Sequence, residues 1–418
     1  MMKLQEGVNL HFIETDQFTT NRIRLRFAAE MNEATVAGRV LVANILEMGN
    51  QDFQTSRSLR SRLAELYGAH FSTSVAKRGR VHCVDLTISY VNPNYLPDNE
   101  DITSGILDFL YSCLFKPLQK GNGFDEKVFD VEKRNLISLL EAEIEDNFYH
   151  ADVEISKLFY KDPALQISKV GRIDLVEKET PESTFKIYRN MLRMDKIDIF
   201  VLGQVDQQLV QERLEKFGFN YRNPKLELEY HQEYSNITRE KIERKQARQS
   251  ILELAYHLPV VYNDVNFPAL VVFNGLFGGF SHSKLFMNVR EKESLAYTIG
   301  SQLMIFSGLM KVYAGINRGD RLRAMKLISK QLLDLKCGKF TEEELALTKN
   351  MLIYSATLAQ DGQNNLIEQL YNEVSLENRG LNWSEWIEAI KSVSIDDVIR
   401  VGQMVNLQAV YFMEGTGE

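Results

Sequence analysis

Residues 250–318 contain, in order, the segments SILELAYHLP (250–259), PALVVFNGLFGG (268–279), SKLFMNVREKE (283–293), AYTIGSQLMI (296–305) and MKVYAGINR (310–318). The first segment has the pattern of a strand, the next two have the pattern of helices, and the last two that of paired strands. The same order occurs near the start of the chain, from NRIRLRFAAEM (21–31) to VHCVDLTISYV (81–91). Because one order of elements occurs twice, we predict that the chain contains two copies of one fold.

The two halves also end alike, with a predicted helix followed by a closing strand, at residues 183–206 and 396–416. Neighbouring strands in the hairpin-like regions are expected to be antiparallel. We therefore predict the α+β class, with two homologous half-domains, each a mostly antiparallel sheet with helices packed on one face. The predicted domains are residues 1–222 and 250–418. Residues 223–249 are charged, contain only scattered apolar residues, and are predicted to be a surface linker.

The composition indicates a globular protein without a general affinity for polyanions. Of the 418 residues, 44% are hydrophobic and 25% charged, and the net charge of −8 argues against binding to nucleic acid or to an anionic membrane surface. No apolar run is long enough for a signal peptide or a membrane helix. The three cysteines are far apart and form no CxxC pair, which favours a reducing compartment. We predict a cytoplasmic protein.

Several separate blocks carry a resemblance to a known superfamily. They are LAELYGAHFSTSVAKRGRVHCVDL (63–86), VEKRNLISLLEAEIED (131–146) and GGFSHSKLFMNVREKESLAYTIGS (278–301). Over essentially its whole length the chain resembles the pitrilysin–insulinase–mitochondrial processing peptidase superfamily. That resemblance implies half-domains that form half of a clamshell around an extended peptide. The opening segment EGVNLHFIETDQFTTNRI (6–23) resembles a bacterial subgroup that accompanies a zinc-bearing subunit and is associated with 5-aminopentanol modification of elongation factor P.

The zinc motif of that superfamily is missing from this chain. Active members carry HxxEH on their first helix, where two histidines bind Zn²⁺ and the glutamate acts as general base, and a later helix supplies a third ligand. With Gly49 as the anchor, the motif falls on residues 40–44, and the third ligand falls near Leu139. The vacated zinc-site positions are Val40, Ala43, Asn44 and Leu139.

No other HxxEH occurs, and the seven histidines are at least 12 residues apart. We therefore expect no metal and no cofactor in this chain, and zinc in the partner subunit. The local alternative for residues 40–44 is simply the core face of a helix. A zinc site assembled from distant histidines is the alternative that would contradict this expectation.

The resemblance also implies a substrate-binding pair, Arg290 and Tyr297, with Gly278 and Gly279 upstream. A tyrosine hydroxyl can donate to the oxyanion that forms when zinc-bound hydroxide attacks an amide. A guanidinium offers a planar fork of donors to peptide carbonyls. The alternative for the arginine is a charge that complements the end of a helix, and for the tyrosine ordinary packing with its hydroxyl at the surface.

Other features have weaker functional interpretations. The glycines are expected to form a tight turn that substrate can approach, whereas a phosphate loop is disfavoured because Ser283, not glycine, precedes Lys284. The acidic residues Glu141, Glu143, Glu145 and Asp146 are expected to be a solvated helix face. Trp383 and Trp386 are expected to pack in the core or at an interface. The strand after Ser250 is treated as an edge strand that could pair with an extended peptide.

Three functional hypotheses follow. The first is the non-zinc subunit of a heterodimeric metallopeptidase, whose partners are an HxxEH-bearing homologous subunit and an extended peptide or unfolded polypeptide. In this hypothesis the chain is not catalytic alone. The second is an inactive peptide-binding or scaffolding subunit, because a fold does not determine a function. The third is an autonomous enzyme with an unrecognised site.

Overall fold

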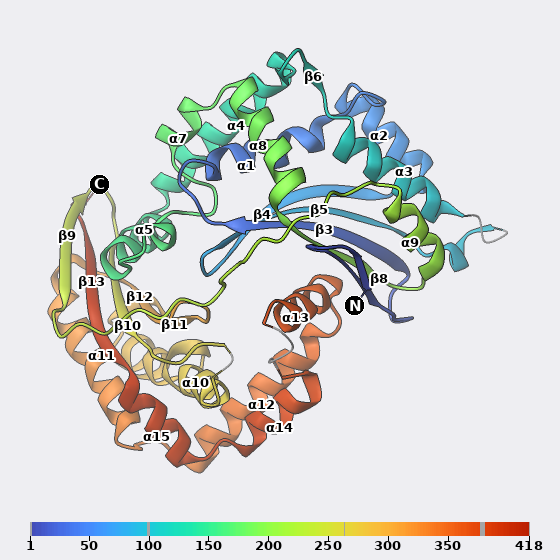
Figure 1. The fold of residues 1–418 in the computed structure, drawn as a ribbon. Coiled ribbons are helices and arrows are strands. Elements are labelled where there is room, and N and C mark those ends of the chain that lie inside the picture. The colour runs from blue at the N-terminus through green and yellow to red at the C-terminus, as the bar shows by residue number, and fades with distance from the viewer. Residues whose placement is uncertain (1, 98–100, 263, 377–380, 418) are drawn as a thin grey trace. The chain divides into compact units, whose positions relative to one another are not determined.

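The computed structural model describes residues 2–97, 101–262, 264–376 and 381–417 (Figure 1). The chain divides into two compact units. Unit 1 contains residues 1–142, 167–227 and 363–371, and unit 2 contains residues 143–166, 228–362 and 372–418. The predicted domain boundaries follow the order of the chain, whereas each compact unit also contains one segment from the other half.

Unit 1 is built on a six-stranded sheet in the order β1-β2-β8-β3-β5-β4. Its strands are β1 (Met2–Gln5), β2 (Val8–Ile13), β3 (Thr20–Glu30), β4 (His70–Arg78), β5 (Val81–Val91) and β8 (Lys196–Leu202). The β2–β8 pair is parallel and the other pairs of this sheet are antiparallel. A small hairpin, β6 (Gln119–Lys120) and β7 (Gly123–Phe124), lies outside this sheet.

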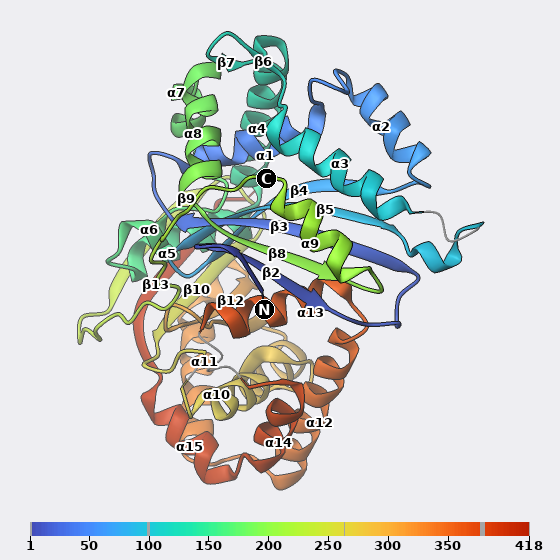
Figure 2. The ribbon, with the colours of Figure 1, turned by 45° about the vertical axis from the view of Figure 1, so that its right-hand side comes forward.

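The two faces of the unit 1 sheet differ in polarity because side chains alternate along each strand. On β3, Ile23, Leu25 and Phe27 are fully buried, and α1 and α8 pack on the sheet. The opposite face carries the arginines of β3 and is covered by the first part of α13 (Gln363–Ser375). Figure 2 shows β3, β4, β5 and β8 side by side in this sheet. The helices that complete the unit are α1 (Val36–Met48), α2 (Ser56–Glu65), α3 (Ile102–Phe115), α4 (Glu126–Glu145), α7 (Ile173–Lys178), α8 (Pro181–Met194), α9 (Gln207–Glu215) and the short η1 (Pro93–Tyr95).

Unit 2 is built on a five-stranded sheet in the order β11-β12-β10-β13-β9. Its strands are β9 (Arg239–Lys245), β10 (Ser250–His257), β11 (Ala296–Met304), β12 (Leu309–Ile316) and β13 (Asn406–Gly415). The β13–β9 pair is parallel and the other pairs are antiparallel. The helices are α5 (Asn147–Phe159), α6 (Pro163–Gln166), α10 (Phe267–Asn274), α11 (Arg321–Lys336), α12 (Glu342–Ala359), α14 (Trp383–Ser392), α15 (Ile395–Met404) and the short η5 (Arg318–Asp320).

Strand β10 lies between two cores. Its residues Leu252 and Leu254 face a large core with α10, α11, α14 and α15, and Trp386 packs at the margin of that core. Ile251 and Ala255 face a second core that includes α5. The α+β class and the mostly antiparallel sheets are thus confirmed, and the structure adds a helix on the second face of each sheet.

The two sheets have the same strand order, which confirms the duplication. The order β2-β8-β3-β5-β4 in unit 1 corresponds to β9-β13-β10-β12-β11 in unit 2, and the parallel pair occupies the same place in both. Two local predictions are wrong. Residues 239–245 of the expected linker form β9, the counterpart of β2, and the strand after Ser250 is central because it pairs with both β12 and β13.

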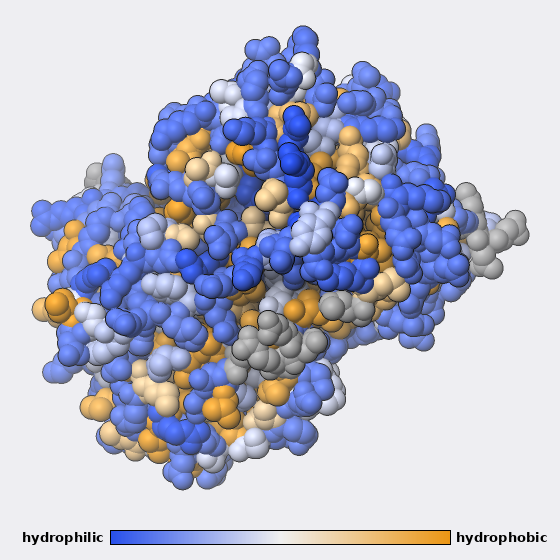
Figure 3. All heavy atoms as spheres, viewed as in Figure 1, coloured by the Kyte–Doolittle hydropathy of each residue, from blue (hydrophilic) through white to orange (hydrophobic). Residues whose placement is uncertain are grey.

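In the described part of the chain, no helix combines the length and the apolar character needed to cross a membrane. The face in Figure 3 is mostly hydrophilic, with hydrophobic residues scattered over it, as expected for a surface rich in charged side chains.

Candidate functional site

The glycine-rich segment of the predicted site is helical. Helix α10 continues into a π-helical turn, Gly275–Gly279, and a second π-helical segment, Phe286–Lys292, contains Arg290. Gly275 has φ −59° and ψ −44°, so the expected glycine turn is a helical turn instead. Such π-helical segments often occur at functional sites.

Close packing explains the glycine at position 278. A Cβ atom on Gly278 would lie 2.7 Å from both the backbone nitrogen and the Oγ of Ser301 on β11. The Oγ of Ser301 donates to Asn274 Oδ1 at 2.8 Å, which fixes the same junction between helix and strand. Gly278 therefore allows the π-helical turn to lie directly against the strand that contains Tyr297.

We expect Gly278→Ala to lower the free energy of unfolding by about 1–3 kcal/mol, because the added methyl group would overpack this junction. Urea unfolding of the isolated chain measures the change. Gly319→Ala is the matched control, because a Cβ atom there would meet nothing within 4 Å. A Gly278→Ala variant as stable as that control would contradict this account of the glycine.

Arg290 lies near the C-terminal end of the second π-helical segment, and 41% of its side chain is exposed. Its guanidinium carbon is 4.5 Å from the centre of the Phe286 ring, and its Nε is 3.7 Å from Glu291 Oε1. The ring orients the guanidinium by a cation–π contact. Within the described residues the guanidinium donates no hydrogen bond, so its donors are available to a ligand.

Tyr297 is the extra residue of a β-bulge. Ala296 is opposite Ile316 and Thr298 is opposite Gly315, so Tyr297 has no partner of its own on β12. Bulges change the direction of a side chain, and here Tyr297 and Thr298 are both exposed. Tyr297 is 69% exposed, and its hydroxyl makes no hydrogen bond to any described residue.

A short turn connects Arg290 to Tyr297 within unit 2. The backbone nitrogen of Leu295 donates to the carbonyl oxygen of Val289 at 3.0 Å, and Ser294 has a left-handed backbone with φ 49°. This hydrogen bond holds the start of β11 against the turn of helix that precedes Arg290. Arg290 and Tyr297 therefore lie on either side of one short turn, the first in a π-helical segment and the second in β11.

The phosphate-loop interpretation is not supported by the contacts of the lysine. Lys284 Nζ donates to both carboxylate oxygens of Glu344 on α12, at 2.6 and 2.8 Å. His282, which sequence reasoning did not single out, stacks on Phe280 and contacts Thr348 Oγ1 through its Nε2 at 2.9 Å. These contacts attach the segment before Arg290 to α12. Because Lys284 is paired with Glu344, it is not available to bind a phosphate.

Three of the four vacated zinc-site positions are apolar, and two of the four are buried. Val40 is 4% and Ala43 1% exposed on α1, Asn44 is half-buried, and Leu139 on α4 is 49% exposed. No group of three or more His, Cys, Asp or Glu residues that could hold a metal ion occurs in the described ranges.

Two carboxylates on these same helices were not predicted from the sequence. Glu132 on α4 is 5% exposed, and its pKa is raised by burial and, to a smaller extent, by the charge of Glu47 on α1. Glu47 itself accepts hydrogen bonds from the backbone nitrogen and the Oγ1 of Thr73. The Glu47 carboxylate thus connects α1 to Thr73 on β4, and this contact stabilises the fold of unit 1.

The acidic run lies at the end of α4. Glu141, Glu145 and Asp146 are exposed, and Asp146 caps α5 by accepting from the backbone nitrogens of Phe148 and Tyr149. These three residues agree with the expected solvated face, whereas Glu143 is half-buried and its Oε2 is buried without a hydrogen-bond partner among the described residues.

Comparisons with known proteins identify the family of this chain. The family model described as Peptidase M16 inactive domain matches residues 178–352. The chain is 30% identical over 411 residues to the probable inactive metalloprotease YmfF of Bacillus subtilis, covering 98% of this chain and 96% of that protein. It is 24% identical over 250 residues to the uncharacterized zinc protease YmxG of Bacillus subtilis, covering 58% of this chain and 59% of that protein. A crystal structure of a conserved protein from Enterococcus faecalis superposes with a TM-score of 0.96 at 36% identity, covering 100% and 98% of the two chains. The chain therefore belongs to the peptidase M16 family, as a homologue of its inactive type.

Proposed function

We propose that this chain is the non-zinc subunit of a heterodimeric metallopeptidase and that it binds an extended peptide for a homologous, HxxEH-bearing partner. The observation that carries the proposal is the exposed Tyr297 hydroxyl, which is held at a bulge beside the segment of Arg290. The apolar side chains at Val40 and Ala43 support the assignment of zinc to the partner.

The chemistry divides naturally between two such subunits. Zinc in the partner would supply a hydroxide that attacks the scissile carbonyl. Tyr297 would donate to the oxyanion, and Arg290 would bind a neighbouring peptide carbonyl. Bacillus subtilis has both a probable inactive metalloprotease and an uncharacterized zinc protease that are similar to this chain, which supports a division of roles between two homologous chains.

Strand β11 is the edge strand that an extended peptide would join. It pairs with β12 on one side and lies at one edge of the unit 2 sheet. Unpaired backbone groups on such an edge bind peptides of many sequences by adding a strand. Because Tyr297 lies on β11, this mode of binding would place the peptide beside the strand that carries Tyr297.

The test is reconstitution from two purified chains. The chain is mixed with an HxxEH-bearing homologue from the same genome, and cleavage of a fluorogenic peptide library is measured for each chain and for the mixture. We expect cleavage only in the mixture and stoichiometric zinc only in the partner. Equal cleavage by the partner alone would contradict the proposal, as would stoichiometric zinc in this chain.

A non-catalytic scaffolding role is the second candidate, and an apolar stripe on α12 favours it. Leu347, Met351, Tyr354 and Leu358 are all exposed and follow each other at intervals of four, three and four residues. This spacing is that of a seam that packs against another helix. In a scaffold, substitution of Arg290 would leave the function of the complex intact, whereas substitution of Met351 would disrupt it.

We also propose a cytoplasmic location and a role in the 5-aminopentanol modification of elongation factor P. Both functional candidates are compatible with that role. A deletion strain distinguishes them: restoration of the modification by the Arg290→Ala chain favours the scaffold, and failure of that chain favours the peptidase subunit.

A further inference from the structure

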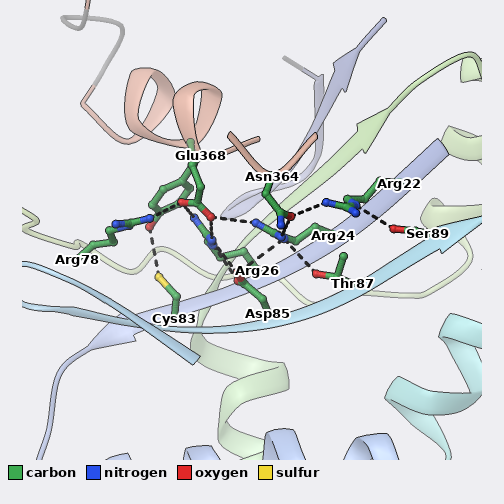
Figure 4. A network of polar contacts seen from close by, with 11 residues as sticks. Arg22, Arg24, Arg26, Arg78, Cys83, Asp85, Thr87, Ser89, Asn364 and Glu368 are labelled. Carbon is green, nitrogen blue, oxygen red and sulfur yellow. Dashed lines mark hydrogen bonds and ion pairs between the residues drawn. The ribbon is translucent and has the colours of Figure 1, made fainter. Parts of the chain in front are cut away.

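A row of arginines lies on the polar face of the unit 1 sheet. Arg22, Arg24 and Arg26 alternate along β3, and their partners on β5 are Ser89, Thr87 and Asp85. Residues 363–371, which belong to the same compact unit, cover this row with Asn364 and Glu368 (Figure 4). Tyr371 of the same segment lies against the Arg26 guanidinium.

Positive charge exceeds negative charge in this cluster. Asp85 and Glu368 are its two carboxylates, and Arg24, Arg26 and Arg78 all pair with Glu368. Arg22 is the fourth guanidinium, and within the described chain it has no carboxylate partner. It donates instead to two neutral oxygens, Ser89 Oγ at 2.9 Å and Asn364 Oδ1 at 2.5 Å.

Two guanidinium groups converge on one neutral atom. Arg22 Nη1 and Arg24 Nη2 both donate to Asn364 Oδ1, at 2.5 and 2.7 Å. The pKa values of both arginines are lowered by burial, and the charge of Arg24 further lowers that of Arg22. A carboxylate oxygen at this point would be a stronger acceptor than the amide and would reduce the repulsion between the two cations.

Exposed residues lie beside the convergence point, and Asn364 is itself exposed. Arg22 is only half-buried, and its row across the sheet continues through Ser89 to His70, which is exposed on the edge strand β4. The Asn364 carboxamide is planar and has the shape of a carboxylate, so a group of that size fits between the guanidinium groups.

We propose that Arg22 and Arg24 form a binding site for one carboxylate of a bound peptide, which takes the place of the Asn364 side-chain oxygen. The carboxylate comes from an aspartate or glutamate side chain or from the peptide's free C-terminus. Peptide as the source rests on the proposed function, whereas the anion site depends only on the residues of unit 1. The site makes the chain selective for acidic peptides without any role in bond cleavage.

Three pentapeptides added to the isolated chain test this proposal. They are acetyl-AAQAA-amide, acetyl-AAEAA-amide and acetyl-AAQAA with a free C-terminus, and their affinities are measured by calorimetry at constant ionic strength. We expect at least one carboxylate peptide to bind about tenfold more tightly than the neutral peptide, because a hydrogen bond to a charged group contributes about 1.5 kcal/mol or more. The stronger of the two identifies the source of the carboxylate.

Two variants and one control locate the effect. Arg22→Gln removes the unpaired cation, and Asn364→Asp supplies an internal carboxylate of the same shape, so both should abolish the preference. Arg60→Gln replaces an exposed arginine on α2 and should leave it unchanged. Equal affinity of the wild type for all three peptides overturns the proposal, as does a preference that persists in Asn364→Asp. Neither outcome depends on a zinc partner, so failure here is distinct from failure of the proposed peptidase.

Discussion

Replacement of Arg26 by methionine is expected to lower the free energy of unfolding by about 3–5 kcal/mol, the usual cost of removing one member of a buried ion pair. Arg26 is fully buried and donates from Nε and Nη2 to the two oxygens of Asp85, at 2.8 and 2.7 Å. It also donates to both oxygens of Glu368, and its guanidinium carbon lies 4.2 Å from the centre of the Tyr371 ring. Methionine keeps much of the volume but leaves Asp85 buried without its main counter-charge.

Chemical denaturation of the isolated chain measures this change. Arg24 remains 3.8 Å from Asp85, and Arg78 remains paired with Glu368, so the loss should lie towards the lower end of the range. Arg60→Met, on the exposed face of α2, serves as the matched control. A decrease in the free energy of unfolding of less than about 1 kcal/mol is the size expected for a surface ion pair, and it would contradict the prediction.

The pH dependence provides an independent check on the same network. The arginines around Glu368 lower its pKa from 4.5 to about 2, against the opposing effect of burial. A carboxyl whose pKa is lower in the folded state stabilises the fold above its unfolded pKa and loses that contribution as the pH falls. The wild type should therefore lose stability between about pH 4.5 and pH 2, and the loss should be smaller in the Arg26→Met variant.

The duplication could be predicted from the sequence because alternation and helical periodicity occur in both halves. Strand β9 is an exposed edge strand with little side-chain burial. Its sequence, REKIERK, is therefore mostly charged and lacks the alternation of apolar and polar residues by which a strand is predicted. The parallel pairing of β9 with β13 depends on a distant partner rather than on local pattern. For the same reason, β10 could not be recognised as a central strand before its two neighbours were known.

The residues of the candidate site stay a prediction from the sequence, to which the structure adds their local geometry. The positions of Arg290 and Tyr297 came from their spacing in a recognisable block, whereas the bulge that exposes Tyr297 depends on the register with β12. The arginine row was visible in the sequence as alternation at residues 22, 24 and 26. Its covering residues, Asn364 and Glu368, are more than 300 positions away, and no local signal connects them to β3.

The largest effect on activity is expected from Tyr297→Phe in the reconstituted complex, where kcat should fall by about 100–1,000-fold, as on removal of one oxyanion donor. KM should change little, because the lost hydrogen bond would form mainly in the transition state. The stability of the isolated chain should not change, since the hydroxyl of this exposed side chain bonds to no described residue. Tyr221→Phe removes the hydroxyl of a tyrosine that is 66% exposed and lies outside both proposed binding surfaces, and it is the matched control. Steady-state kinetics with the HxxEH subunit distinguish the two variants. Wild-type kcat in Tyr297→Phe would exclude the hydroxyl from the reaction and leave the scaffolding role as the better account of this chain.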